Sequence, residues 1–300
     1  MAERMTGTDG VALCTESFGA RSDPPVLLIM GTGASMLWWD EGLCRTLAAG
    51  GRFVIRYDHR DTGRSVTYEP GRPGYSGADL ADDAVRVLDA LGIPAAHLVG
   101  VSAGGALAQS VALDHPARVR SLVLVSTSPA VGGGRELPPP TEEFTRFVTT
   151  AQVDWTQAAS VAEYLVAYAR VLAGGRRPFD EDAVRELVRR DIARADDFAA
   201  VRNHDVLPAG RPLHRSPASI TAPTLVIHGT ADPMFPLGHG EALAAAVPGA
   251  RLLPLENAGH GVDPADRATI ARAILAHTAH IPRVHRGRRH GRERFGGTAR

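Results

Sequence analysis

The sequence predicts an α/β protein in which helices flank a mostly parallel central sheet and a helical cap is inserted between two strands. Three observations support this fold class. Short apolar runs recur along the chain, helix-period segments separate them, and one long stretch contains no strand-like run. Near-continuous apolar strands that alternate with helices are typical of a parallel sheet covered on both faces. With 300 residues, 44% of them hydrophobic, the chain can bury a large core.

The predicted strands are short runs rich in Val, Ile and Leu. They span residues 26–30, 53–57, 97–101, 122–125, 225–227 and 251–255. Residues 11–18 alternate between apolar and polar positions, which favours an antiparallel strand at the start of the sheet.

Helical periodicity predicts the elements between these strands. The predicted helices cover residues 38–49, 80–91, 106–114, 160–172 and 180–194. Gly50 and Gly92 are stop signals, and Asp263 followed by Pro264 is a typical start for a last helix that runs past Ile274.

The predicted domain organisation follows from where the alternation of strands and helices stops. Residues 1–129 and 216–282 form the two parts of the core, and residues 130–215 form the helical cap. Residues 283–300 hold seven Arg and one Glu, a net charge of +6, with almost nothing to bury, which predicts a disordered basic tail. An anionic surface or RNA could bind such a tail. We favour a solvated extension whose deletion leaves catalysis intact.

Composition excludes several classes of protein. The formal net charge is zero, so the chain as a whole has no bias toward nucleic acid. Cys14 and Cys44 are too few for a disulfide framework, and no cluster has the spacing of metal ligands. No apolar run has the length of a signal peptide core or a membrane span. We therefore expect a cytoplasmic protein without metal or cofactor; the oligomeric state does not follow from the sequence.

The most informative motif is a Gly-x-Ser-x-Gly formed by Gly100, Ser102 and Gly104. A predicted strand enters it and an alanine-rich helical segment leaves it. This is the layout of a nucleophile elbow, a tight turn that lifts a serine above the edge of a sheet. The glycines leave room for the turn.

Two further residues stand where a serine nucleophile needs its partners. Asp232 follows the predicted strand 225–227, and His260 follows the strand 251–255. We expect Ser102 to attack a carbonyl carbon, His260 to accept and return the proton, and Asp232 to orient the imidazole. Residues 126–128, an alternative position for the acid, contain no carboxylate.

An oxyanion needs donors already in place, and the backbone can supply two. The predicted donors are the N–H groups of Ala103, next to the nucleophile, and of Thr32, in the loop after the strand 26–30.

Neighbouring apolar residues are candidates for the substrate pocket. They are Gly31, Trp38, Trp39, Met234 and Phe235. The two tryptophans fit packing of the first helix equally well. Aromatic residues of the cap fit its core as well as a pocket: Phe144, Phe147, Trp155, Tyr164, Tyr168 and Phe198. Residues 58–65 predict a structural loop in which Asp58 pairs with Arg60.

Taken together, Gly100-x-Ser102-x-Gly104, Asp232 and His260 resemble the α/β-hydrolase superfamily. Stretches at 28–31, 56–65, 112–116 and 274–278 are similar to aclacinomycin methylesterase and related actinobacterial hydrolases. The resemblance covers about residues 10–280, and the cap cannot be matched. That family removes a methyl ester from an anthracycline polyketide.

We therefore expect a serine esterase that forms an acyl-enzyme with an apolar small-molecule ester, including polyketide methyl esters. A C–C bond hydrolase or a haloperoxidase-like perhydrolase on the same scaffold is the alternative. A non-catalytic ligand-binding module is the alternative of another class, because fold does not determine function.

Overall fold

The central sheet is the frame of the molecule. The computed structural model describes residues 3–8, 10–130, 136–208, 210 and 215–279. Within them, eight strands form one sheet in the order β1-β2-β4-β3-β5-β6-β7-β8. Their bounds are β1 Arg4–Thr8, β2 Val11–Phe18, β3 Pro25–Ile29, β4 Phe53–Tyr57, β5 Ala96–Val101, β6 Val119–Val125, β7 Thr224–Gly229 and β8 Arg251–Leu255.

Pairing in this sheet is parallel from β4 through β8, while β2 pairs antiparallel with both β1 and β4. The predicted fold class, with its antiparallel strand at residues 11–18, is confirmed. Strand β1 was not predicted, because its sequence, Arg-Met-Thr-Gly-Thr, has no apolar run.

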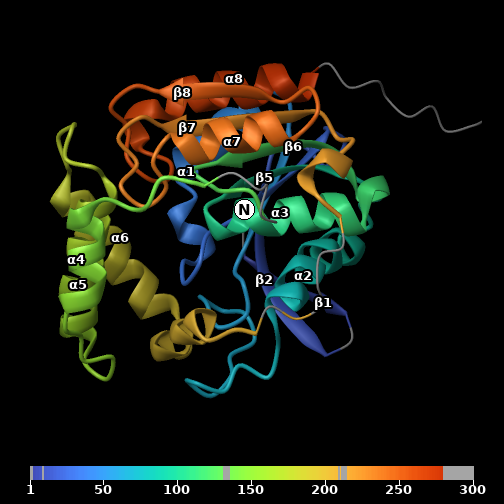
Figure 1. Cartoon of the computed structure of the whole chain (residues 1–300). Helices are drawn as coiled ribbons and strands as arrows, with labels where there is room; N and C mark the ends of the chain where they lie inside the picture. The colour runs from blue at the N-terminus through green and yellow to red at the C-terminus, as the bar shows by residue number, and fades with distance from the viewer. Residues whose placement is uncertain (1–2, 9, 131–135, 209, 211–214, 280–300) are drawn as a thin grey trace, which may run out of the picture.

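Helices occupy the connections between strands (Figure 1). Their bounds are α1 Glu41–Ala49, α2 Gly77–Ala90, α3 Ala103–Asp114, α4 Glu142–Thr150, α5 Ala158–Leu172, α6 Glu181–Arg194, α7 Gly238–Ala246 and α8 Arg267–Ala279. Short 3₁₀ segments are η1 Met36–Trp38, η2 Pro116–Arg118, η3 Phe198–Asp205, η4 Pro217–Ser219 and η5 Pro264–Asp266.

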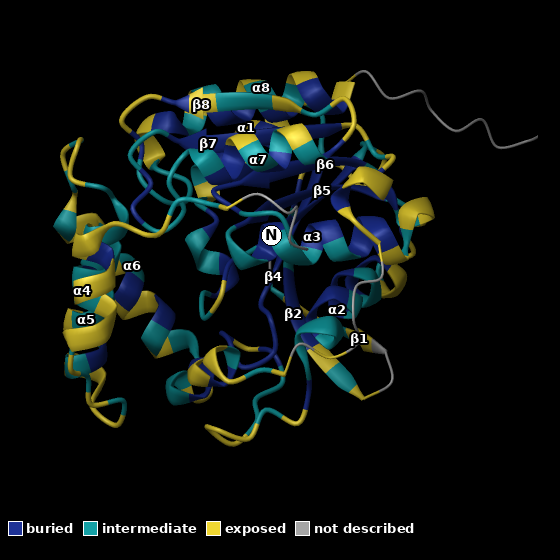
Figure 2. Ribbon diagram, viewed as in Figure 1, coloured by how far each residue is buried: buried dark blue, intermediate teal, exposed yellow. Residues whose placement is uncertain are grey.

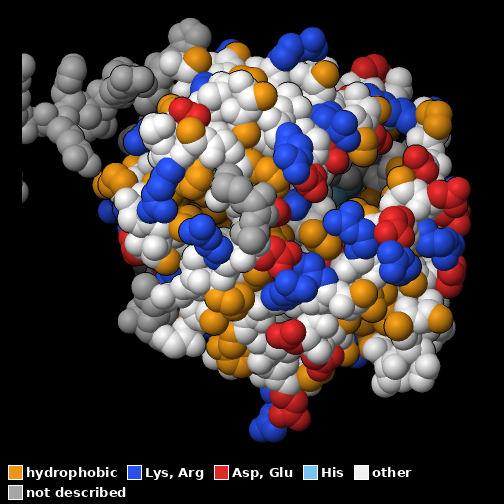
Figure 3. Space-filling model, turned by 180° about the vertical axis from the view of Figure 1, so that it is seen from behind, with side chains coloured by type: hydrophobic (Ala, Val, Ile, Leu, Met, Phe, Trp, Pro, Cys, Tyr) orange, Lys and Arg blue, Asp and Glu red, His pale blue; other side chains and the backbone are white. Residues whose placement is uncertain are grey.

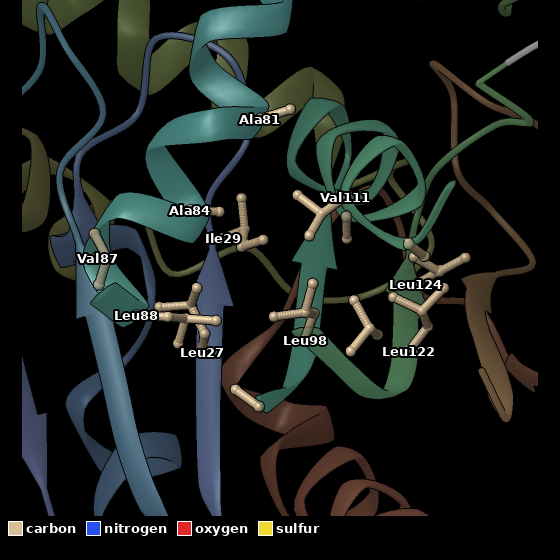
Figure 4. Packing of buried hydrophobic residues seen from close by; sticks show 14 of the residues in the cluster. Leu27, Ile29, Ala81, Ala84, Val87, Leu88, Leu98, Val111, Leu122 and Leu124 are labelled. Atoms are coloured by element: carbon tan, nitrogen blue, oxygen red, sulfur yellow. The ribbon is translucent and has the colours of Figure 1, made fainter. Parts of the chain in front are cut away.

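Two hydrophobic cores cover the two faces of the sheet. One packs α2, α3 and α7 against one face, and the other packs α1 and α8 against the opposite face. Alternate residues of β3 serve the two cores: Leu27 lies in the first and Leu28 in the second. Figure 4 shows the first core, where Leu98 of β5 and Leu122 of β6 lie beneath α2 and α3. Burial on both faces explains why these strands are apolar throughout.

The first helix begins later than its sequence predicts. Asp40 caps α1 by accepting a hydrogen bond from the Leu43 N–H, so the two tryptophans precede the helix. Trp39 is fully buried in the core beneath α1 and α8. Its predicted place in the substrate pocket is therefore wrong, because the indole fills the hydrophobic core instead. At the other end of the chain, Asp263 caps the 3₁₀ turn η5, which leads into α8.

Between β6 and β7, the described residues form helices and turns without a strand. Helices α4 and α5 stand apart from the helices that cover the sheet, and their outer faces are exposed (Figures 1 and 2). The predicted cap boundaries at 130 and 215 lie beside residues 131–135 and 211–214, which are outside the described residues. The division into domains stays a prediction.

The surface carries charges of both signs. Arginine and acidic side chains are interspersed on the face seen in Figure 3, in keeping with a net charge of zero. The predicted basic tail, residues 283–300, lies outside the described residues. No helix in the described part of the chain is long and apolar enough to cross a membrane.

Candidate active site

Ser102 occupies a strained turn between β5 and α3. Its φ is 53°, in the left-handed region that non-glycine residues rarely adopt. The Ser102 N–H donates to the Val125 carbonyl at the end of β6, 2.9 Å away. A side chain at Gly104 would collide with the carbonyl oxygens of Ile29 and Met30. A side chain at Gly100 would collide with the Gly104 carbonyl oxygen, so the two sides of the turn also approach as closely as the glycine motif predicts.

The Ser102 hydroxyl is not used to cap α3. Ser102 stands at the N-cap position, where serine usually accepts a hydrogen bond from the second or third N–H of the helix, but the side chain makes no such bond. Ala103 begins the helix, so its N–H has no acceptor within α3. The hydroxyl and this donor lie at the same turn.

The loop after β3 approaches the serine from the side. A methyl group at position 31 would lie 3.3 Å from Ser102 Cβ and 3.8 Å from Ser102 Oγ. Gly31 thus leaves open the space beside the hydroxyl. Thr32 follows with an exposed side chain, and Gly33 adopts a left-handed φ of 66°. These positions bring the predicted donor loop next to Ser102.

Asp232 and His260 meet beyond the ends of β7 and β8. Asp232 Oδ2 lies 2.8 Å from His260 Nδ1, and both side chains are almost fully buried. Asp232 Oδ1 accepts the backbone N–H groups of Met234 and Phe235, at 3.0 and 2.8 Å. A carboxylate beside Nδ1 keeps the proton on that nitrogen, which leaves Nε2 able to act as a base.

Three contacts hold the loop that carries His260. The His260 N–H donates to the carbonyl of Leu172, the last residue of α5, at 2.8 Å. The Gly261 N–H donates to Ser126 Oγ at 3.0 Å. Phe235 packs edge-on against the imidazole, with ring centroids 5.6 Å apart. The histidine is therefore held both from the sheet and from the segment between β6 and β7.

Ser126 contacts the His260 loop, although the sequence does not single it out. It follows β6, where only the lack of a carboxylate was noted. Its left-handed φ of 45° turns the hydroxyl toward the Gly261 N–H. A serine just after a buried strand is a weak signal, and no spacing rule would have singled it out.

His228 is a second missed residue, buried beneath the acid loop. Its Nε2 donates to the Phe235 carbonyl at 2.6 Å and lies 3.6 Å from Asp232 Oδ2. Burial lowers the pKa of His228, so the ring stays neutral and does not neutralise Asp232. It supports the turn that presents Asp232 to His260.

The predicted loop 58–65 is buried except at Arg64, but its ion pairs differ from the prediction. Asp58 pairs with Arg194 of α6 at 2.7 Å, and Arg60 binds Asp83 of α2 through two hydrogen bonds. The predicted Asp58–Arg60 pair is therefore wrong, because each finds a partner distant in sequence.

Three more of the predicted pocket residues are partly buried, two of them after Asp232 and one beside α6. Met234 and Phe235 are partly buried in the turn after Asp232, and Trp38 is half-buried with its indole N–H donating to Asp191 of α6 at 2.8 Å. Within the described residues, no group of three or more His, Cys, Asp or Glu side chains is placed to hold a metal ion.

Comparison with known proteins bears on this arrangement. Residues 24–262 match the family model described as alpha/beta hydrolase fold. The chain belongs to the α/β-hydrolase family. The superfamily that its motifs resemble is confirmed.

Two similar proteins extend along nearly the whole chain. The rhodomycin D methylesterase DauP of Streptomyces sp. (strain C5) is 36% identical over 297 residues, and DnrP of Streptomyces peucetius, of the same name, is 35% identical. Each alignment covers 93% of this chain and 98% of the relative. A hydrolase from Pseudomonas aeruginosa of known structure superposes with a TM-score of 0.70 at 28% identity, covering 92% of this α/β hydrolase and 98% of the other chain.

Proposed function

We propose that this α/β hydrolase is a carboxylic ester hydrolase that works through Ser102, His260 and Asp232. The observation that carries the proposal is the buried 2.8 Å contact between Asp232 and His260, at the sheet edge where the strained Ser102 turn also lies. Relatives named methylesterase over nearly the full chain support ester hydrolysis.

The proposed reaction has two halves. Ser102 Oγ attacks the ester carbonyl carbon while His260 Nε2 takes the hydroxyl proton. The oxyanion is stabilised by the N–H groups of Ala103 and Thr32. Its collapse breaks the bond to the alkoxy oxygen, which leaves as an alcohol with the proton from His260. Water then attacks the acyl-enzyme by the same steps, releasing the acid and restoring Ser102. No metal or cofactor takes part.

The proposed substrates are apolar small-molecule esters, including polyketide methyl esters like those implied by the names of the relatives. Gly31, Trp38, Met234 and Phe235 are the proposed pocket residues on the side of the sheet. Residues 130–215 are the proposed cap that selects among substrates, because α5 directly contacts the His260 loop.

The test compares Ser102→Ala with the matched control Ser110→Ala, which lies on the helix that follows Ser102 and whose hydroxyl donates to the Ala106 carbonyl. Both are assayed on p-nitrophenyl esters and aromatic methyl esters and treated with a fluorophosphonate probe. We expect hydrolysis and labelling in the wild type and in Ser110→Ala, and neither in Ser102→Ala. Activity retained by Ser102→Ala would refute the mechanism.

Two other outcomes are informative. A wild type that the probe does not label would indicate a binding protein. A labelled wild type that hydrolyses no ester would indicate C–C hydrolysis or perhydrolysis on the same residues.

A further inference from the structure

Two histidines hold the two ends of the short loop that follows β3. The Met30 carbonyl, just before Gly31, lies 2.9 Å from His59 Nε2. The Gly33 N–H, just after Thr32, donates to His204 Nδ1 at 2.9 Å. The peptide that would supply the Thr32 donor lies between these two anchors.

Hydrogen-bond roles define the tautomers of both rings. His59 Nε2 faces a carbonyl and must donate. His204 Nδ1 faces an N–H and must accept, while its Nε2 donates to the Arg60 carbonyl at 2.9 Å. Burial lowers the pKa of His59 and, helped by the nearby His59, lowers the pKa of His204 to about 4. At neutral pH, the lone pair of His204 Nδ1 is therefore available to Gly33.

His204 comes from a distant part of the chain, the segment η3 between α6 and β7. Its neighbour Asn203 is fully buried and donates to Asp61 Oδ2 at 2.9 Å, while Asn203 Oδ1 accepts the Gly71 N–H at 2.6 Å. The ring of His204 also packs edge-on against His59, with centroids 6.0 Å apart. His204 is thus a fixed support rather than a loose side chain.

The loop needs such a support. Gly33 has a left-handed φ of 66°. Glycine adopts left-handed and right-handed conformations about equally readily, so its own preferences do not fix this conformation. Thr32 is exposed. If the Thr32 N–H is the oxyanion donor proposed above, rotation of the peptides around Thr32 would turn it away from the oxyanion. A misplacement of about 1 Å at a reacting centre can lower a rate by about 100-fold.

We propose that His204 is a positioning residue for the oxyanion loop, and that it couples the segment between β6 and β7 to catalysis. The proposal rests on the function proposed above. His204 touches no substrate; it acts by accepting the Gly33 N–H and so orienting the donor of Thr32. His59 holds the other end of the same loop.

Two substitutions separate this role from mere packing. Asparagine can place an oxygen near the position of Nδ1, and glutamine can place an amide nitrogen near Nε2. His204→Asn therefore keeps the acceptor for Gly33 and loses the bond to Arg60. His204→Gln keeps the bond to Arg60 and loses the acceptor. The matched control is His97→Asn, a buried histidine at the start of β5 that bonds to Ser121.

The experiment measures kcat and KM on a p-nitrophenyl ester, with active sites counted by complete fluorophosphonate labelling. This count expresses kcat per folded site, even where a variant is less stable. The inhibition constant of a trifluoromethyl ketone is measured alongside, because its hydrated or serine-bound form mimics the tetrahedral intermediate.

We expect His204→Gln to lower kcat at least tenfold with KM changed less than about threefold, since a lost oxyanion donor costs about 100-fold or more. The ketone should bind more weakly by the same factor as kcat/KM falls. His204→Asn and His97→Asn should stay within about threefold of the wild type. Equal losses in the Asn and Gln variants, or no loss in either, would overturn the proposal.

Failure of the proposed function has a different signature. In that case Ser102→Ala retains activity or the wild type is not labelled, whatever happens at His204. Hydrolysis that depends on Ser102 but is unaffected by His204→Gln would refute only the role of His204.

Discussion

The carboxyl ends of the strands, called the sheet edge below, and the helical segment between β6 and β7 meet at the candidate site. The two regions are held in place by different kinds of contact. At the sheet edge, backbone hydrogen bonds join the loops to the strand ends. The Ser102 N–H binds the end of β6, and the Ala231 N–H binds the Ala258 carbonyl at 2.9 Å. These bonds extend the parallel ladder directly into the loops that carry the proposed triad.

The helical segment is held mainly by buried polar side chains. Asp191 binds the Trp38 indole, Arg194 binds Asp58 and Glu3, and Asn203 binds Asp61. Each of these contacts involves at least one carboxylate, and Asp58, Asp61 and Asp191 are buried, so loss of the donor leaves a buried carboxylate uncompensated. We therefore expect side-chain substitutions at the sheet edge to leave the fold unchanged. Removal of one ion pair should instead displace the helical segment.

The largest expected effect is on chemistry at the sheet edge. Asp232→Asn should leave the fold intact, because the backbone bonds remain. It should lower kcat by about 1000-fold or more, since the wrong tautomer of His260 is then favoured. Thermal unfolding and ester kinetics on the same samples check both parts. A fall in Tm comparable to that of a core mutant would show that the edge depends on this carboxylate for its structure.

The next effect is structural and lies in the helical segment. Arg194→Met removes the partner of buried Asp58 and should lower the free energy of unfolding by about 3 kcal/mol. It should also raise KM, because α6 is no longer held to the loop 58–65. The control is Arg189→Met on the same helix, whose pair with Glu186 is exposed; it should change stability by less than about 0.5 kcal/mol. Equal losses of unfolding free energy in the two variants, measured by urea unfolding, would contradict the expected difference between the buried and the exposed ion pair.

A further effect concerns the acid stability of the sheet. Burial lowers the pKa of His97 from its usual 6.5 to about 3, so the folded state keeps this ring neutral while the unfolded state protonates it. Its contribution to stability is fully present above pH 6.5. It is lost as the pH falls toward 3, at about 1.4 kcal/mol per pH unit for one proton.

The measurement is urea unfolding between pH 7 and pH 4. Wild type should lose stability throughout this window, and His97→Asn should lose it with a shallower slope. Parallel slopes in the two proteins would show that His97 does not contribute, and that the other buried histidines carry the dependence.

Much of the fold followed from local pattern. Continuous apolar runs identify strands such as β3 and β5 because burial on both faces leaves no polar positions. Strand β1 and the start of α1 escaped prediction, since a polar edge strand and a capping aspartate after two tryptophans give no clear periodicity. Trp39 could equally have faced a pocket or a core, and only its burial decided.

Local sequence pattern was enough to predict the parallel strands, the elbow around Ser102 and the order in which Asp232 and His260 follow it. These features depend on residues near one another along the chain, through turn sterics and strand hydrophobicity. By contrast, the contacts of Asp58 with Arg194, of Arg60 with Asp83 and of His204 with Gly33 depend on how distant segments pack together. The partners in these pairs are separated by tens to more than a hundred residues. The sequence does not indicate which residue a charged side chain or an imidazole will bind. Packing of α2 and of the β6–β7 segment against the sheet makes that choice, by burying each polar group where one complementary group is within reach.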